Sequence, residues 1–302
     1  YFMQSKRIRF DVNGVILLDK SLGYSSNQAL SLIKKTFNPK KAGHTGTLDP
    51  LATGLLPVCM GEATKFSSFL LESNKSYEAS IKLGYESSTG DLEGELESLN
   101  IKIFPKLEEV HKVITSFLGE QDQLPPMFSA LKFKGKPLYE YARKGEDVER
   151  KKRKINIISL EIMEYQNDVL KIHVECSKGT YIRTLASDIG VSLKTGGYLT
   201  ALRRTAIGNI DVSDASSIDL IERMSNLERE ALILPIDTLI KNIKKIILES
   251  NEVKAIQDGK TLLLKNYDTG IYRLYSCEEI FLGLGDVDSH GYLKVRRLLA
   301  TN

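Results

Sequence analysis

Residues 41–66 read KAGHTGTLDPLATGLLPVCMGEATKF, and this segment is the most informative part of the chain. Its glycines permit backbone turns that other residues avoid, while Pro50 and Pro57 fix φ and stiffen the chain. Leucines stand on both sides of Asp49, and apolar neighbours exclude water and strengthen a fixed carboxylate. We therefore predict that residues 42–61 form a rigid loop that holds Asp49 in place.

The same segment allows three other interpretations. Taken alone, an Asp-Pro pair is most often an ordinary turn, and the leucines around it would then belong to a core. A phosphate-binding P-loop does not fit, because no Gly-Lys-Ser/Thr sequence closes the segment. A metal site built on His44 and Asp49 lacks further ligands at a workable spacing, so we predict no metal.

Strand-like and helix-like patterns interleave on both sides of this segment. The apolar run 15–18 predicts a buried strand that ends at Asp19-Lys20, and Ser25 or Ser26 is placed to cap a helix that ends before Pro39. Because βαβ regularity is missing, we predict an α+β core with a mixed β-sheet and flanking helices. Apolar spacing predicts further helices over 63–70, 107–117 and 182–193, and further strands over 77–83, 155–162, 170–176 and 202–210.

The length of 302 residues and the 42% hydrophobic content predict one large domain and one small one. The last ~60 residues consist of short strand-like segments between Gly and Asp, a pattern typical of a small β-barrel. We therefore place a catalytic domain at 1–240 and a small C-terminal domain at 241–302. No apolar run reaches membrane-spanning length, and no signal peptide is recognised at the start of the chain.

The net charge of the whole chain is only +3, so a nucleic-acid-binding surface has to be local. Residues 132–154 contain ten Lys or Arg against four Asp or Glu, and aromatic residues are interleaved with them. Cations contact phosphates and aromatic rings stack on bases, so we predict an RNA-gripping insertion at about 124–154. A solvated charged loop is the alternative for this insertion.

The three cysteines are widely separated, and an odd number without paired spacing argues against a disulfide framework and against zinc. This pattern favours a reducing, cytoplasmic location.

Residues 43–54, GHTGTLDPLATG, closely resemble the signature of the TruB family, the bacterial tRNA pseudouridine-55 synthases. Further segments resemble the other motifs of this family in the same order: NGVILLDKSLGYSSNQAL (13–30), SYEASIKLG (76–84), CSKGTYIRTLASDIG (176–190) and ALRRTAIG (201–208). The residues from about 243 resemble, more weakly, a PUA-like RNA-binding module.

The resemblance implies an enzyme that isomerises uridine-55 in the T arm of tRNA to pseudouridine. Such an enzyme breaks the N-glycosidic bond, turns the uracil and joins C5 to the ribose, with neither redox chemistry nor hydrolysis, so no cofactor is expected. The target uridine has to be flipped out of a folded arm. We expect a monomer that binds tRNA, without a membrane and without an obligate protein partner.

The resemblance also assigns roles to individual residues. It makes Asp49 the nucleophile and places Arg183 beside it, where a guanidinium keeps the carboxylate ionised. It makes Tyr77 the tyrosine that stacks on the target base. Without the resemblance, Arg183 would be read as a surface helix residue and Tyr77 as part of the core.

Four further residues correspond to positions of the family that contact substrate. His44 corresponds to a histidine that touches the RNA where the nucleotide is extruded, and Tyr181 and Leu202 to positions that line the uridine pocket. Lys20 corresponds to a supporting lysine beside the active site. For Asp91, which follows Gly90 in an evident turn, we expect a structural role.

Two other functions remain alternatives. One is a catalytically silent RNA-binding protein or tRNA-folding chaperone on the same fold, and the other is a synthase for a different RNA, for instance one guided by a partner. The presence of Asp49, Tyr77 and Arg183 together argues against a silent protein, because binding alone does not need all three.

Overall fold

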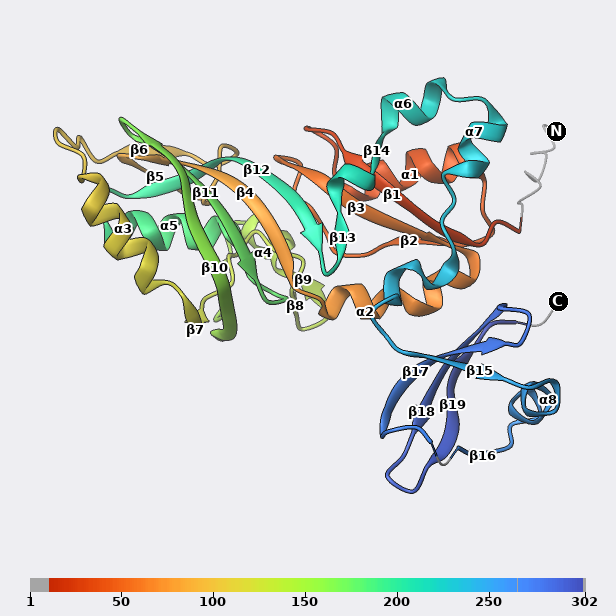
Figure 1. The fold of residues 1–302 in the computed structure, drawn as a ribbon. Helices are drawn as coiled ribbons and strands as arrows, with labels where there is room; N and C mark the ends of the chain where they lie inside the picture. The colour runs from red at the N-terminus through yellow and green to blue at the C-terminus, as the bar shows by residue number, and fades with distance from the viewer. Residues whose placement is uncertain (1–10, 265, 301–302) are drawn as a thin grey trace.

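The computed structural model describes residues 11–264 and 266–300. A mixed sheet of ten strands forms its centre (Figure 1). Its strands are β1 (Gly14–Lys20), β2 (Ala42–His44), β3 (Ala52–Met60), β4 (Lys75–Leu83), β7 (Gly119–Gln123), β10 (Arg153–Gln166), β11 (Val169–Cys176), β12 (Gly197–Ile207), β13 (Ile210–Asp211) and β14 (Ser216–Ser217). The order is β14-β1-β3-β12-β4-β11-β10-β7, with β2 paired to β3 and β13 to β12. Parallel and antiparallel pairs both occur, which confirms the predicted mixed α+β fold.

Helices lie at both ends of this sheet (Figure 1). They are α1 (Ser26–Phe37), α2 (Ser67–Glu72), α3 (Leu107–Ser116), α5 (Ile182–Ser192), α6 (Ile218–Arg223) and α7 (Asn226–Ala231). The predicted first helix is confirmed: Ser25 caps α1 in a capping box with Gln28, and Asn38 ends it in the left-handed conformation. The apolar face of α1 packs in one core with side chains of β1 and β3.

The prediction of one loop over residues 42–61 is wrong for most of that range. Residues 52–60 form the strand β3, whose residues 54–60 pair with β1, and only residues 45–51 lie between β2 and β3. Seven consecutive residues from Gly54 to Met60 are buried, because both faces of this part of the sheet are covered. Pro57 is accommodated inside the strand, opposite Leu17, and its carbonyl accepts a hydrogen bond from the Thr45 N–H at 3.0 Å.

The other predicted elements are present with shifted ends. The helix predicted over 63–70 is a 3-10 turn, Gly61–Phe66, followed directly by α2. Strand β12 starts five residues earlier than predicted, at Gly197, and turns at Gly208 into the short strand β13. A small hairpin, β5 (Tyr85–Ser87) with β6 (Leu96–Ser98), lies between β4 and α3.

The C-terminal residues form a second, curled sheet with its own small core (Figure 1). It contains β15 (Lys245–Leu248), β16 (Leu262–Leu263), β17 (Gly270–Ser276), β18 (Phe281–Val287) and β19 (Tyr292–Leu298), together with α8 (Ser250–Gln257). Contacts join it to two 3-10 turns outside the large sheet, Gly61–Phe66 and Ile236–Ile240: the rings of Phe66 and Phe281 are 5.5 Å apart, and Asp237 Oδ2 lies 2.6 Å from Arg273 Nη1.

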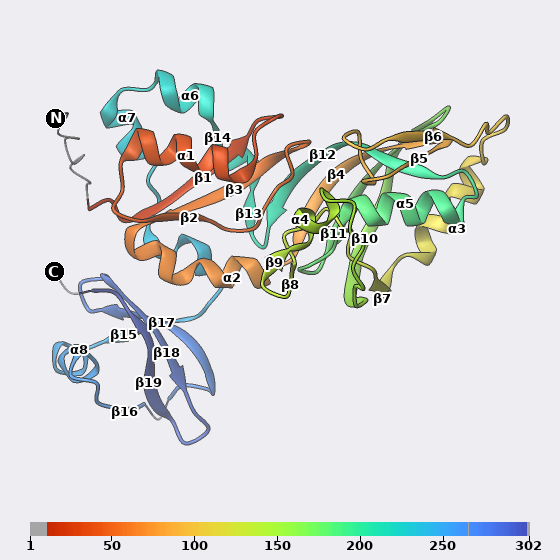
Figure 2. The same cartoon turned by 180° about the vertical axis from the view of Figure 1, so that it is seen from behind.

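The predicted insertion at about 124–154 consists of β8 (Lys132–Phe133), β9 (Lys136–Pro137), α4 (Leu138–Ala142) and connecting loops. Figure 2 shows it beside α5 and β10. Among the helices of residues 11–264 and 266–300, none combines the length and apolarity needed to cross a bilayer.

Candidate active site

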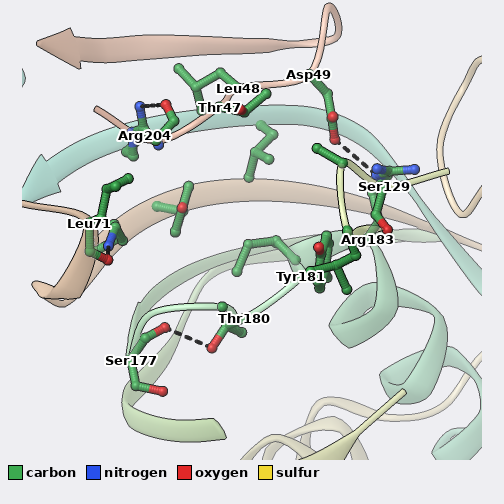
Figure 3. A pocket seen from close by; sticks show the side chains of 18 residues that line it. Thr47, Leu48, Asp49, Leu71, Ser129, Ser177, Thr180, Tyr181, Arg183 and Arg204 are labelled. Carbon is green, nitrogen blue, oxygen red and sulfur yellow. Dashed lines mark hydrogen bonds and ion pairs between the residues drawn. The ribbon is translucent and has the colours of Figure 1, made fainter. Parts of the chain in front are cut away.

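A cavity of ≈ 330 Å³ opens over the middle of the large sheet, on the face where α5 packs (Figure 3). Six parts of the chain meet there: the loop 45–51, helix α2, strands β4 and β12, the insertion, and the turn that leads into α5 together with the first residues of that helix. Its walls are formed by Gly46, Thr47, Leu48, Asp49, Leu71, Lys75, Tyr77, Ser129, Ala130, Leu131, Ser177, Gly179, Thr180, Tyr181, Ile182, Arg183, Leu202 and Arg204. Five predicted site residues, Asp49, Tyr77, Tyr181, Arg183 and Leu202, therefore share one pocket although they are far apart in the sequence.

Asp49 points from the loop toward Arg183 at one end of the pocket (Figure 3). Asp49 Oδ2 lies 3.0 Å from Arg183 Nε, and the carboxylate side chain keeps 40% of its surface exposed while the arginine is nearly buried. A buried Ser26 hydroxyl holds the base of the loop, because it accepts a hydrogen bond from the Leu48 N–H at 2.7 Å. The carboxylate is therefore fixed, oriented and still open to the pocket.

Arg183 is held on every side of its guanidinium. It lies in the first turn of α5 and donates hydrogen bonds to the carbonyls of Thr89, at 3.1 Å, and Phe128, at 2.7 Å. Asp91 Oδ2 lies 3.5 Å from the same Nε that contacts Asp49. One arginine therefore links two carboxylates, and the contact to Phe128 ties it to the insertion.

Opposing effects act on the ionisation of Asp49. Burial raises its pKa above the ordinary value, Arg183 lowers it, and the nearby negative charge of Asp91 raises it again. Burial is the largest of these effects, and the net direction of the pKa is upward. A carboxylate with a raised pKa is a stronger base and a better nucleophile than a fully solvated one.

Tyr77 and Arg204 are neighbours on adjacent strands, where they are cross-strand partners in the pairing of β4 with β12. Burial raises the pKa of Tyr77, and the charge of Arg204 and a hydrogen bond with it act in the opposite direction. The Tyr77 hydroxyl is therefore a neutral phenol near neutral pH. Tyr77 is 8% exposed and forms part of the pocket wall.

Arg204 is 1% exposed and fixes the other end of the loop. It donates hydrogen bonds to the carbonyls of Leu55, at 2.8 Å, and Gly46, at 3.1 Å. The backbone of β12 passes so close to β3 here that a Cβ on Gly54, whose φ is +100°, would lie 2.2 Å from the Arg204 carbonyl oxygen. The glycine of the quoted signature is needed for this close approach.

Lys20 is completely buried at the end of β1 but is not among the residues that line the pocket. Its ammonium donates to the carbonyls of Ser21, at 3.1 Å, and Tyr24, at 2.6 Å. Burial lowers its pKa to about 8, while the charge of Asp49 acts in the opposite direction. Lys20 is therefore close enough to Asp49 for the two charges to interact, although it does not line the pocket.

His44 lies on β2, outside the pocket wall. Burial lowers its pKa, with Arg204 and Lys34 adding to the effect, so the imidazole is neutral near neutral pH. Its buried Nδ1 has no hydrogen-bond partner within the described part of the chain. The structure thus places His44 beside the loop that carries Asp49, but not next to the carboxylate.

Two residues of the site escaped the sequence-based assignment. Asp91 was expected to have a structural role in a turn, and it does lie in a turn; it is also 2% exposed, with its Oδ2 3.5 Å from Arg183 Nε, a contact that was not predicted. Arg204 was quoted within a motif without a role, and it lines the pocket. A charged residue in the middle of an alternating strand was the available signal for Arg204, because the same alternation that buries Leu202 also buries the residue two positions later.

Within residues 11–264 and 266–300, no cluster of three or more His, Cys, Asp or Glu is arranged to hold a metal ion. The groups that the pocket does present are one accessible carboxylate, two buried guanidinium groups, the buried ammonium of Lys75, the phenols of Tyr77 and Tyr181, and apolar walls. This set can bind a planar polar ring and stabilise charge on it. It can also deliver a nucleophile or base to one edge of that ring.

Three family models match consecutive parts of the chain. They are the TruB family pseudouridylate synthase N-terminal domain at residues 34–182, the tRNA pseudouridylate synthase B C-terminal domain at residues 183–241, and the pseudouridine synthase II TruB C-terminal model at residues 245–299.

Curated relatives match along nearly the whole chain. The tRNA pseudouridine synthase B of Azoarcus sp. (strain BH72) is 47% identical, with 99% of each chain covered. The protein of the same name from Nitrosospira multiformis is 45% identical, with 95% of this chain and 96% of the relative covered. Among solved structures, "Structure of H/ACA RNP bound to a substrate RNA containing 2'-deoxyuridine" matches with a TM-score of 0.72 at 23% identity, covering 95% of this chain and 85% of the other. At that identity the likeness concerns the fold.

Proposed function

The chain belongs to the TruB family of pseudouridine synthases, and from this premise we propose that it converts uridine-55 in the T arm of tRNA to pseudouridine with Asp49 as the nucleophile. The observation that supports this most directly is the Asp49–Arg183 contact of 3.0 Å at one end of the pocket. The pocket volume, ≈ 330 Å³, lies in the range of small-ligand sites, about 300–1,000 Å³, so a single flipped nucleoside is a suitable occupant.

The isomerisation needs no group that this pocket lacks. When the bond between N1 and C1′ breaks, its electron pair leaves on the uracil. C5 of the turned base then bonds to C1′, the C5 proton is lost and N1 gains a proton, so atoms and charge balance. Asp49 can act by attack on C1′ or on C6, or by assisting departure of the base while a ribose proton is removed; its position at the pocket edge is compatible with each route.

The remaining side chains divide into supporting roles. Arg183 keeps Asp49 ionised and aimed, and Asp91 holds the arginine from its other side. Tyr77, Tyr181 and Leu202 form walls against which the base stacks. Lys20 adds positive charge behind Asp49, and His44 contacts the RNA backbone or a base beside the extruded nucleotide.

We assign tRNA gripping to the insertion at 124–154 and to the C-terminal sheet. The insertion forms one pocket wall through Ser129, Ala130 and Leu131, so an RNA whose nucleotide occupies the pocket lies next to the insertion. We place the boundary between the synthase domain and the PUA-like domain after residue 240, since the C-terminal sheet has its own core. The pocket is built from one chain, which favours a monomer, and the free thiols of Cys59, Cys176 and Cys277 favour the cytoplasm.

Mapping of pseudouridine at single-base resolution in unmodified tRNA transcripts tests this function. Purified protein should place one new pseudouridine at position 55, and a transcript with cytidine at that position should stay unmodified. Modification of other positions only would point to a different RNA or site. Tight tRNA binding without any pseudouridine would favour the chaperone alternative.

The raised pKa of Asp49 leads to a pH prediction. Only the carboxylate form can act, so the single-turnover rate should fall as the pH is lowered through the pKa of Asp49. That inflection should lie above the ordinary aspartate value of 3.8. The rate should be measured at saturating enzyme from about pH 3 upward, with tRNA binding measured at each pH. An inflection at or below the ordinary value would contradict the assignment.

Reversing two charges of the insertion should distinguish tRNA binding from the rate of the chemical step. Lys132 and Lys136 are exposed on β8 and β9, and the Lys132→Glu, Lys136→Glu double variant should bind tRNA more weakly. If each lysine neutralises one phosphate, the slope of log affinity against log salt should flatten by about two units. The single-turnover rate at saturating enzyme should be nearly unchanged, because phosphate contacts position the substrate without touching the base.

The matched control reverses the exposed Lys102 and Lys112, near the far end of the large sheet, which changes the net charge equally. This control should leave the salt slope within error of the unchanged protein. An equal flattening in both double variants would mean that overall charge, and not the insertion, determines binding.

A further inference from the structure

The Arg204 guanidinium is a buried positive charge without a carboxylate partner among the described residues. The side chain is 1% exposed, and the hydrogen bonds of its Nε and Nη2 go to the uncharged carbonyls of Leu55 and Gly46. Arg183, the other buried arginine of the pocket, has two carboxylates within 4 Å. Arg204 therefore brings net positive charge into the pocket, and Arg183 does not.

Arg203, the preceding residue of β12, differs from Arg204 because it has a carboxylate partner. Arg203 points to the opposite face, where its Nη1 and Nη2 donate to the two oxygens of Asp19 at 3.0 and 2.8 Å. It is partly exposed and fully paired. Two consecutive arginines therefore differ in two respects: of the pair, only Arg204 lines the pocket, and only Arg204 lacks a carboxylate partner among the described residues.

An unpaired buried charge is costly, because desolvation removes its water shell without an opposite charge in return. Such a group is stable only where the surrounding structure fixes it, and here the loop and β3 do so through their carbonyls. A fixed, desolvated cation of this kind stabilises negative charge that develops in the pocket during the reaction. In Figure 3, Arg204 lies at the other end of the pocket from Asp49 and Arg183, so a bound base would lie between the two arginines.

We propose that Arg204 stabilises the negative charge that the uracil carries once its bond to C1′ has broken. In the same step, Arg204 holds Tyr77 in position against the base. This inference rests on the proposed function. Cleavage leaves the bonding pair on the base, and the charge spreads over N1 and the two carbonyl oxygens. The anion persists until C5 bonds to C1′, so a fixed cation at this end of the pocket lowers the barrier to cleavage and keeps the free base from leaving.

A substrate whose base stabilises its own anion separates this role from a structural one. Fluorine at C5 withdraws electrons, so 5-fluorouracil is a better leaving group than uracil and depends less on an external cation. The experiment uses synthetic T-arm hairpins with uridine or 5-fluorouridine at the target position. It measures disappearance of the target nucleoside in single turnover at saturating enzyme.

Arg204→Met removes the charge and keeps the length of the side chain. With the uridine hairpin we expect a loss of about 100-fold in rate, as for the removal of one preorganised electrostatic group. With 5-fluorouridine the loss should be smaller by about tenfold or more. Equal losses on the two hairpins would overturn the proposal, because a merely structural defect slows both substrates alike.

Two further variants keep the test decisive if Arg204→Met folds poorly, which thermal unfolding would reveal. Arg204→Lys retains the positive charge, so any loss of rate should be the same on both hairpins; a loss confined to uridine would contradict the proposal. Arg203→Met is the matched control on the opposite face and should change either rate by less than about threefold. If the unchanged protein converts neither hairpin, it is the proposed function that fails and not the role of Arg204.

Discussion

The Asp49→Asn variant should form essentially no pseudouridine, with a loss of ~10⁴-fold or more in the single-turnover rate. The amide has nearly the volume of the carboxylate and can still accept a hydrogen bond from Arg183 Nε through its oxygen. It carries no negative charge and is neither a nucleophile nor a base. The loop itself should persist, because Ser26, Gly46 and Arg204 hold it through backbone contacts that the substitution leaves alone.

Binding measurements provide the control for Asp49→Asn. The variant should bind unmodified tRNA within about threefold of the unchanged protein, since one partly exposed carboxylate contributes little to a contact dominated by phosphates. Its thermal unfolding midpoint should also be close to that of the unchanged protein. Turnover above a few per cent of the original rate would remove Asp49 from the role of nucleophile.

Arg183→Met should slow the reaction by about 10²–10³-fold. Without the guanidinium, Asp49 faces Asp91 with no cation between them, so burial and like-charge repulsion both disfavour the ionised carboxylate. The acid inflection of the rate should therefore move to higher pH than in the unchanged protein, and part of the lost rate should return as the pH is raised.

The same variant should also unfold more easily. Asp91 is nearly buried and would lose its cation, which costs about 3 kcal/mol when one partner of a buried pair is removed. Urea unfolding measures this loss. Arg183→Lys is the companion variant: it keeps the charge but not the planar donor set, so its inflection should lie between the other two. An unshifted inflection in Arg183→Met would mean that Arg183 does not control the ionisation of Asp49.

The alternation of apolar residues was enough to predict most of the large sheet. Strands β4 and β11, with one face on the core, show the period of two that the sequence displays. Strand β3 was missed because it is buried on both faces and therefore lacks alternation, and because Pro57 and Gly54 normally argue against a central strand. The structure explains both residues: the Pro57 carbonyl accepts a hydrogen bond from Thr45, and Gly54 leaves room for the backbone of Arg204. Neither contact can be derived from local sequence.

Some residues of the site could likewise be predicted from the sequence, and others could not. Asp49, Tyr77 and Arg183 lie in long motifs, and the structure brings all three to one pocket as expected. Asp91 is different, because a Gly-Asp turn gives no indication of the arginine that it will meet, 92 positions later in the chain. Local sequence describes a turn correctly, but the charge partner depends on how the β5–β6 hairpin packs beside α5. Long-range ion pairs of this kind cannot be derived from periodicity.

Loss of the C5 hydrogen during isomerisation allows the most direct test of the central claim. Unmodified tRNA carrying tritium at C5 of its uridines should release tritium to water when mixed with the protein, because C5 exchanges its hydrogen for the bond to C1′. The account predicts release that levels off at one tritium per tRNA with the unchanged protein and no release with Asp49→Asn. Release by the Asp49→Asn variant, or a plateau at several tritium atoms per tRNA, would contradict it.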